Sequence, residues 1–341
     1  MKNNHLLRAI LGLTLSAFAV SASADEVSDF YDGKTINVIV PAGPASGYDI
    51  YARLMAEHFS NFMPGKPTVI VQNMPGGGGV KALRYYATVG KSDGTELLLS
   101  PQTIGTDAAL GLLGNAVDVT NLNWIGRFTT NVPVGVVTKK AGIADAAEMI
   151  DKDISLGGTG ARSPSIVFPK ALNAFAGTNI KVVSGFPDPR QSFLAMMQGE
   201  IDGIVLGWSG AKSSNQEMLD SGEMIVLFQA AASRHPDLPD VPTVVDLAEG
   251  DANKAAMRFL ASGSDIGRSI VAHPDVPEAR VTALRDAFAA MLASSEFTET
   301  AATRNVELVN PADHAVLQGH IEETLAVEDA VLATVRKTLG L

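Results

Sequence analysis

Residues 35–49 have the sequence TINVIVPAGPASGYD, and this stretch decides the fold. Its first part, Thr35 to Val40, is β-branched and apolar without strict alternation, as expected of a parallel strand that is buried on both faces. A turn containing Gly43 and Gly47 follows. From Asp49 to Met63, apolar residues recur at helical spacing until Pro64-Gly65 ends the run. The order strand, turn, helix predicts an α/β protein.

The same alternation continues after this unit. It predicts further strands at 68–72 and 96–100 and a helix at 80–89, and therefore a parallel sheet. A second series follows, with strands at 132–138, 154–156, 181–184 and 201–206 and helices at 144–150, 166–175, 189–198 and 211–219. A strand at 224–229 leads away from it, and beyond Pro242 we expect mainly helices, with a strand at 268–272 and helices at 278–292 and 312–339.

A chain of 341 residues exceeds the usual size of one core, which indicates two lobes with a central sheet in each. We expect residues 25–128 and 229–341 to form the first lobe and residues 129–228 the second. Two crossings, near Arg127 and Gln229, would then form a natural hinge.

The N-terminal segment has the features of a secretory leader. Lys2 and Arg8 give a basic start, residues 9–20 are apolar, and Ala22-Ser23-Ala24 is a small-residue cleavage signature. The apolar run is shorter than the roughly 20 residues that a membrane-spanning helix needs. We therefore expect residues 1–24 to be a signal peptide, cleaved after Ala24, and the remaining protein to be periplasmic.

Composition excludes several classes of partner. The chain has 37 acidic and 26 basic side chains, a formal net charge of −11, which disfavours binding to nucleic acid or membrane phosphates. The absence of cysteine fits an oxidising compartment. His314 and His320 are six positions apart and have no cysteine to join them, so that we expect no metal and no cofactor.

The turn at residues 41–49 is the first candidate binding site. Ligands of open α/β sheets bind at the carboxyl ends of strands. Gly43 and Gly47 permit a tight backbone, and the amides at the start of the following helix favour an anion such as a carboxylate or phosphate. In the alternative interpretation the glycines only shape the turn and Asp49 only caps the helix.

A second glycine-rich turn, GGTGARS at residues 157–163, has the same position between a strand and a helix. Thr159 and Ser163 add hydroxyl donors to its amides. Because the two turns belong to different lobes, they could face each other across one cleft.

Two other glycine-containing stretches carry weaker signals. The run MPGGGG at residues 74–79 lacks the Gly-Lys-Ser/Thr ending of a P-loop, so we interpret it as a structural turn. The stretch GWSGA at residues 207–211 is similar to the nucleophile elbow of α/β hydrolases, although Ala211 replaces the final glycine. An exported serine hydrolase that uses Ser209 is therefore an alternative.

Several segments, taken in order, resemble the extracytoplasmic solute receptors of tripartite tricarboxylate transporters, the Bug or TctC-type proteins. They are TINVIVPAG at 35–43, GYDIYAR at 47–53, VQNMPGGGG at 71–79, SDGTELLL at 92–99, GTGARS at 158–163, GEIDG at 199–203 and LPDVPT at 238–243. The resemblance implies a type II-like Venus-flytrap fold, capture of a di- or tricarboxylate between the lobes, membrane permease partners and no catalysis. We expect the receptor itself to be a monomer.

The resemblance also implies which residues bind the ligand. These are Ala42, Gly43, Ser46, Gly47, Tyr48 and Asp49 in the first lobe, with Gln102 beside them, and Thr159, Gly160, Ala161 and Ser163 in the second. Pro44 has no N–H and so removes a donor from the first turn. We expect Asp49 to accept hydrogen bonds from turn amides, water or a ligand donor. An alternative function is that of a sensor, which presents the bound carboxylate to a receptor kinase. Such a sensor would use the same form of the protein, with the lobes closed on the ligand.

Overall fold

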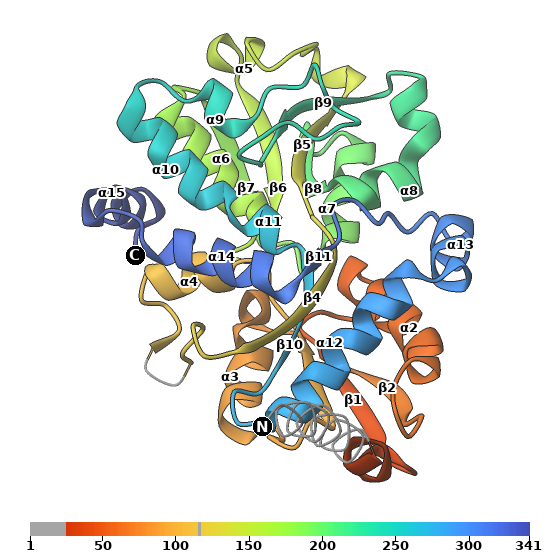
Figure 1. Cartoon of the computed structure of the whole chain (residues 1–341). Helices are drawn as coiled ribbons and strands as arrows, with labels where there is room; N and C mark the ends of the chain where they lie inside the picture. The colour runs from red at the N-terminus through yellow and green to blue at the C-terminus, as the bar shows by residue number, and fades with distance from the viewer. Residues whose placement is uncertain (1–24, 115–116) are drawn as a thin grey trace, which may run out of the picture.

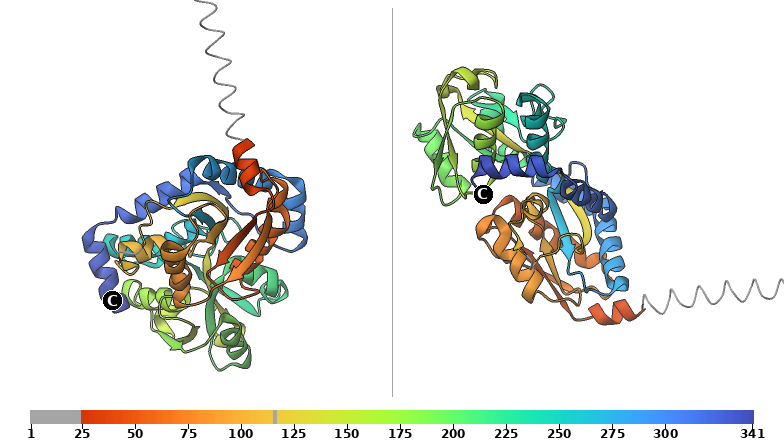
Figure 2. Two further views of the ribbon diagram at one scale, coloured as in Figure 1. Left: turned by 90° about the horizontal axis from the view of Figure 1, so that it is seen from below. Right: turned by 90° about the vertical axis from the view of Figure 1, so that its left-hand side faces the viewer.

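The computed structural model describes residues 25–114 and 117–341, so the predicted leader lies outside the described residues. Two mixed β-sheets, each covered by helices, form two lobes (Figure 1). The right-hand view of Figure 2 separates the lobes most clearly. The predicted two-lobed α/β architecture with a central sheet in each lobe is therefore confirmed.

The first sheet has the strand order β11-β4-β10-β3-β1-β2. Its strands are β1 (Thr35–Val40), β2 (Thr68–Asn73), β3 (Glu96–Leu99), β4 (Asn123–Thr129), β10 (Arg268–Ala272) and β11 (Ala312–Asp313). β1 is parallel to β2 and β3, whereas β10 is antiparallel to β3 and β4. The sheet is mixed, not purely parallel as predicted, because β10 enters it from the second lobe.

Helices cover both faces of the first sheet. They are α2 (Gly47–His58), α3 (Val80–Val89), α4 (Ile104–Ala109), α12 (Glu278–Ala293), α13 (Ser295–Thr303) and α14 (His314–Leu325). Alternate residues of β1 point into different cores: Val38 packs with residues of α2 and α12, and Ile39 packs with residues of α3 and α14. The irregular apolar run at the start of the deciding sequence thus reflects burial on both faces.

The second sheet has the strand order β7-β6-β8-β5-β9. Its strands are β5 (Pro133–Thr138), β6 (Ile154–Gly158), β7 (Ile180–Ser184), β8 (Gly203–Gly207) and β9 (Met224–Gln229), and its nearby helices include α5 (Glu148–Asp151), α6 (Pro164–Phe175), α7 (Pro189–Gln198) and α8 (Trp208–Asp220). β6 is parallel to β7 and β8, and β5 is antiparallel to β8 and β9. The strand ending at Gln229 therefore belongs to this sheet.

Part of the C-terminal region packs on the second lobe, which differs from the expected lobe composition. α9 (Val244–Leu247), α10 (Asp251–Ala261) and α15 (Asp329–Leu339) share a core with β6 and α6. The predicted single helix at 312–339 is two helices, of which α14 packs on β4 and α15 on α6 and α10 (Figure 1). Helical periodicity indicates an apolar face but not the sheet that this face covers.

The described chain consequently passes between the lobes at three places. These are residues 130–132, the segment around α11 (Gly263–Ile266), and residues 326–328. The first crossing is close to the expected position at Arg127. The return occurs near Gly267, not near Gln229.

Candidate functional site

The first turn is held together by the carboxylate of Asp49. Oδ2 accepts hydrogen bonds from the Ala45 amide at 2.7 Å and from Arg53 Nε at 2.8 Å, and Oδ1 accepts one from Asn73 Nδ2 at 2.9 Å. Burial alone would raise the pKa of Asp49, but these hydrogen bonds and the charge of Arg53 lower it below its usual value. The expected acceptance of a turn amide is thus observed, and this carboxylate is engaged within the turn.

The start of α2 lies directly after this turn. Ser46 is the N-cap residue, and its Oγ accepts a hydrogen bond from the Asp49 amide at 3.3 Å. Pro44 has no N–H, and the amide of Ala45 is occupied by Asp49. The amides of Gly47 and Tyr48 have no acceptor within the helix because they belong to its first turn. They are the donors that this turn can offer to an anion.

The second turn lies between β6 and α6. The Thr159 amide donates to Ser165 Oγ at 3.1 Å, and the Ser163 and Ser165 hydroxyl oxygens are 2.8 Å apart. Gly160 is exposed, and no atom lies within 4 Å of the position that a Cβ would occupy there. The turn is thus fixed by its own hydroxyl groups and presents an open face at Gly160.

A polar cluster lies behind the first turn. The Gln102 amide donates to the Tyr48 hydroxyl at 2.9 Å, and Gln102 Oε1 accepts from Arg268 Nη1 at 3.3 Å and from Asn131 Nδ2. The Arg268 guanidinium lies over the Tyr48 ring, 3.8 Å from its centroid. Arg268 and Asn131 belong to β10 and to the first crossing between the lobes, so the cluster joins the turn to the segment that connects the lobes.

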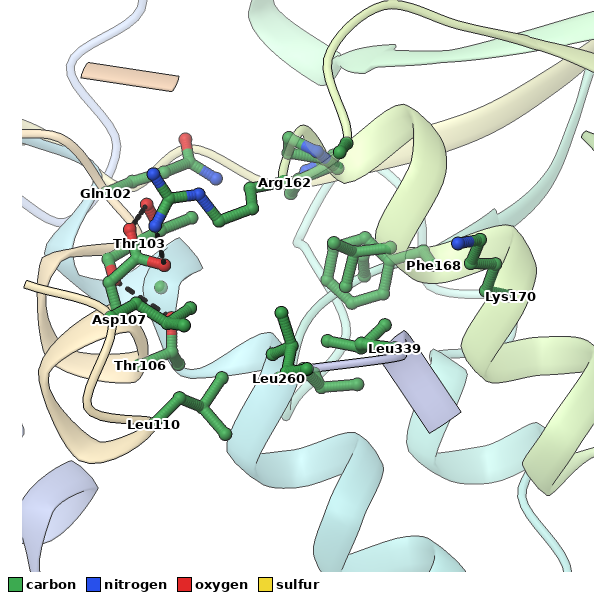
Figure 3. A pocket seen from close by; sticks show the side chains of 18 of the residues that line it. Gln102, Thr103, Thr106, Asp107, Leu110, Arg162, Phe168, Lys170, Leu260 and Leu339 are labelled. Atoms are coloured by element: carbon green, nitrogen blue, oxygen red, sulfur yellow. Dashed lines mark hydrogen bonds and ion pairs between the residues drawn. The ribbon is translucent and has the colours of Figure 1, made fainter. Parts of the chain in front are cut away.

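A cavity of about 190 Å³ lies between the lobes (Figure 3). Gln102 from the first lobe and Ala161 from the second both line it. Polar side chains line one part of its remaining wall, at Thr103, Thr106, Asp107, Arg162, Lys170 and Ser264. Apolar side chains line another part, among them Leu110, Phe168, Leu260 and Leu339. Two of the predicted site residues, one from each lobe, therefore meet at one cavity.

Arg162 of the second lobe contacts residues of the first lobe across this cavity. Its Nη1 lies 3.9 Å from Asp107 Oδ1, and its Nη2 donates to the Gly77 carbonyl at 3.4 Å. Burial raises the pKa of Asp107, although Thr103 and Arg162 act in the opposite direction. No hydrogen bond or ion pair within residues 25–114 and 117–341 joins the two predicted turns directly.

Gly77 belongs to the run at residues 74–79, for which the sequence predicts a structural turn. Gly76, Gly77, Gly78 and Gly79 all have positive φ angles. A Cβ at Gly79 would lie 2.7 Å from Pro101 Cγ. Conformation and close packing both explain the glycines here.

Ser209 lies at a second cavity between the lobes, of about 330 Å³, together with Lys212 and Glu307. In the described part of the chain, no hydrogen bond joins Ser209 to a histidine. His235 Nδ1 instead accepts from the Asp237 amide at 3.1 Å. The base that a serine nucleophile needs is therefore not in place at this serine.

The same described residues contain no group of three or more potential metal ligands. None of their helices combines the length and apolarity needed to cross a bilayer.

Sequence reasoning missed Arg268 and Asn131. The signal for Arg268 was available, because it is a charged residue at the start of RSIVA (268–272), an otherwise uncharged strand whose residues are all buried. Asn131 carried no comparable signal, since a polar residue between two strands is ordinary.

Relatives of known sequence cover most of the chain. A UPF0065 protein of Bordetella pertussis is 25% identical over 93% of this chain and 94% of its own length. The protein BugT of the same organism is 25% identical over 71% of this chain and 73% of its own length. This chain is thus similar to UPF0065 and Bug proteins over most of its length. No family model matches it.

Solved structures show the same fold. The periplasmic binding protein BugD has a TM-score of 0.65 at 19% identity, with 91% of this chain and 99% of BugD covered. MatC of Rhodopseudomonas palustris with bound malate has a TM-score of 0.64 at 21% identity, covering 87% and 99%. An R. palustris protein with adipate has a TM-score of 0.67 at 20% identity, covering 90% and 97%. The resemblance to Bug-type proteins and the predicted fold are thus confirmed.

Proposed function

We propose that this protein is an extracytoplasmic solute receptor that captures a small organic di- or tricarboxylate between its lobes for a tripartite tricarboxylate-type transporter. The observation that carries the proposal is the pair of strand-to-helix turns, one at the start of α2 and one at the start of α6, in a two-lobed protein. The malate and adipate bound to its structural neighbours support a carboxylate as the ligand class.

The proposed contacts come from both lobes. In the first lobe they are Ala42, Gly43, Ser46, Gly47, Tyr48 and Gln102, with Asp49 as the residue that holds the turn. In the second lobe they are Thr159, Gly160, Ala161 and Ser163. The local donors must supply the attraction, because the acidic protein repels an anion at long range and salt screens that repulsion beyond about 8–10 Å.

Thermal unfolding of the purified protein tests this proposal. A ligand that binds only the folded protein raises the apparent unfolding temperature by mass action. We expect a concentration-dependent rise with at least one acid from a panel of malate, adipate, citrate and related acids, and none with the corresponding amides. Unchanged unfolding temperatures across the whole panel would contradict the proposal.

Export is part of the same proposal. The similarity to BugD, a periplasmic binding protein, supports it, and the basic start and cleavage signature of residues 1–24 supply the route. Expression of the full chain in a Gram-negative host, followed by intact-mass measurement of the periplasmic fraction, should give a protein that begins at Asp25. A cytoplasmic protein of full length would contradict export.

The membrane partner can be identified by cross-linking in the native host with and without ligand. Recovery of permease subunits that depends on ligand supports a role in transport. Recovery of a receptor kinase in their place would instead indicate sensing.

A further inference from the structure

The cluster behind the first turn contains a buried positive charge without a carboxylate partner. Arg268 is only 8% exposed, and within the described residues no Asp or Glu forms an ion pair with it. Its polar contact is the neutral Gln102 Oε1, and its guanidinium stacks on the ring of Tyr48. Buried charges are ordinarily paired, because removal from water is costly unless an opposite charge compensates it.

Gly47 keeps this guanidinium accessible from the first turn. A Cβ at Gly47 would lie 3.3 Å from Arg268 Nη2, while Gly47 itself is exposed. The guanidinium thus lies directly behind the amides of Gly47 and Tyr48, the donors that remain free at the start of α2. A bulkier residue at position 47 would come between Arg268 and an approaching ligand.

The side chains around Arg268 fix its position without neutralising it. Gln102 Oε1 also accepts from Asn131, and the Tyr48 hydroxyl accepts from the Gln102 amide. The charge of Arg268 also acts on Tyr51. Burial raises the pKa of Tyr51 to about 12, and the positive charge of Arg268 opposes this rise. A guanidinium held in one orientation is suited to bind a carboxylate through two parallel hydrogen bonds.

We infer that Arg268 is the charged donor of the binding site and pairs with one carboxylate of the ligand, reached over Gly47. This inference rests on the proposed function and extends it, because it assigns the charge recognition to one side chain that compensates for the donor lost at Pro44. Arg268 therefore determines specificity for an ionised acid over its neutral amide.

Titration calorimetry with adipate and L-malate tests this role on the whole protein. Arg268→Gln should weaken binding of either acid by about 100-fold, as expected when one partner of a buried, hydrogen-bonded charge pair is removed. Arg268→Lys should restore part of the affinity, since it keeps the charge but not the planar fork. Without ligand, Arg268→Gln should unfold at a temperature equal to or above that of the wild type, because an unpaired buried charge is removed.

Arg280→Gln is the matched control. The Arg280 guanidinium also lies over an aromatic ring, 3.4 Å from the centroid of Phe30, and donates to the Asp93 carbonyl. It is near the amino end of β3, away from the turn, so affinity should stay within about twofold of the wild type. Gly47→Ala leaves Arg268 in place and should weaken binding while the protein stays folded.

The outcomes separate this inference from the proposed function. If the wild type binds an acid and Arg268→Gln binds it equally well, Arg268 is a structural residue and the inference is wrong. If Arg268→Gln does not fold, the Gly47→Ala variant decides. An affinity of Gly47→Ala equal to that of the wild type then refutes the inference. If the wild type binds neither acid, the proposed function fails with it.

Discussion

Single residues in the two turns perform different tasks. Asp49, a residue that sequence reasoning placed among the ligand contacts, uses both carboxylate oxygens to hold Ala45, Arg53 and Asn73. Gly160 accepts a turn hydrogen bond from the Ser163 amide at 2.8 Å, and the position of a Cβ there faces open space. The first residue therefore shapes its turn, and the second leaves the face of its turn open.

Replacement of Gly160 by valine should leave the protein folded and weaken carboxylate binding. The added side chain meets no atom of the protein within 4 Å of its Cβ, but it fills the face on which the ligand would lie, and overpacking costs about 1–3 kcal/mol. Calorimetric titration measures the loss. Gly319→Val, which is equally open but lies on α14, should bind like the wild type. Undiminished affinity in Gly160→Val would remove this turn from the site.

Replacement of Asp49 by asparagine should lower the free energy of unfolding at pH 7 by about 1–3 kcal/mol, because buried hydrogen bonds of a charged group are lost. The pKa of Asp49 is lowered in the folded protein, so its stabilisation is present above the unfolded pKa of about 3.9 and is lost as pH falls through the folded pKa. The variant should therefore lose less stability below about pH 4 than the wild type. Urea denaturation at several pH values measures both effects.

The exposed Asp240→Asn variant provides the control, since it changes the net charge equally without breaking a hydrogen bond of the first turn. An acid-side stability curve for Asp49→Asn that matches those of the wild type and this control would contradict the role assigned to Asp49.

At the scale of elements, sequence patterns predicted the bounds of helices and strands well, but they predicted poorly which elements pack together. The bounds predicted for α3, α7, β10 and β9 match the structure, because periodicity and turn residues act within a few positions. β4 was not predicted, although its residues Asn123 to Thr129 are mostly buried. The packing of α10 and α15 on the second lobe was also missed, because it depends on contacts between residues that are distant in sequence.

The connection between α11 and β10 depends on a glycine. Gly267 has φ 53° and ψ −125°, and a Cβ there would lie 2.1 Å from the Thr129 carbonyl oxygen. Gly267→Ala should destabilise the protein by about 3 kcal/mol or more, because strain and a backbone clash add. Gly111→Ala, at φ 74° with open space around it, should cost only about 1–2 kcal/mol. Urea denaturation measures the free energy of unfolding of both variants. Equal losses in the two variants would contradict this role of Gly267, because the backbone at the crossing would then be able to shift and admit a Cβ.

At the scale of the whole molecule, ion pairs and one polar cluster connect the lobes around the proposed site. Arg162 reaches Asp107 on one side, and Lys212 reaches Glu307 at 3.1 Å on the other. Asn131 donates a hydrogen bond to Gln102 and lies beside the end of β8, where a Cβ at Gly207 would be 2.8 Å from its Oδ1. The sequence predicted the paired turns but not this connection, because its members come from β10, a crossing segment and the residues after β3.

The central claim is that one carboxylate ligand binds between the lobes, and calorimetric titration of the wild-type protein tests it most directly. We predict saturable binding of adipate, malate or a related acid with one ligand per chain, and no heat of binding with the corresponding neutral amide. Binding of the amide with equal affinity, or no saturable binding of any di- or tricarboxylate, would contradict the claim.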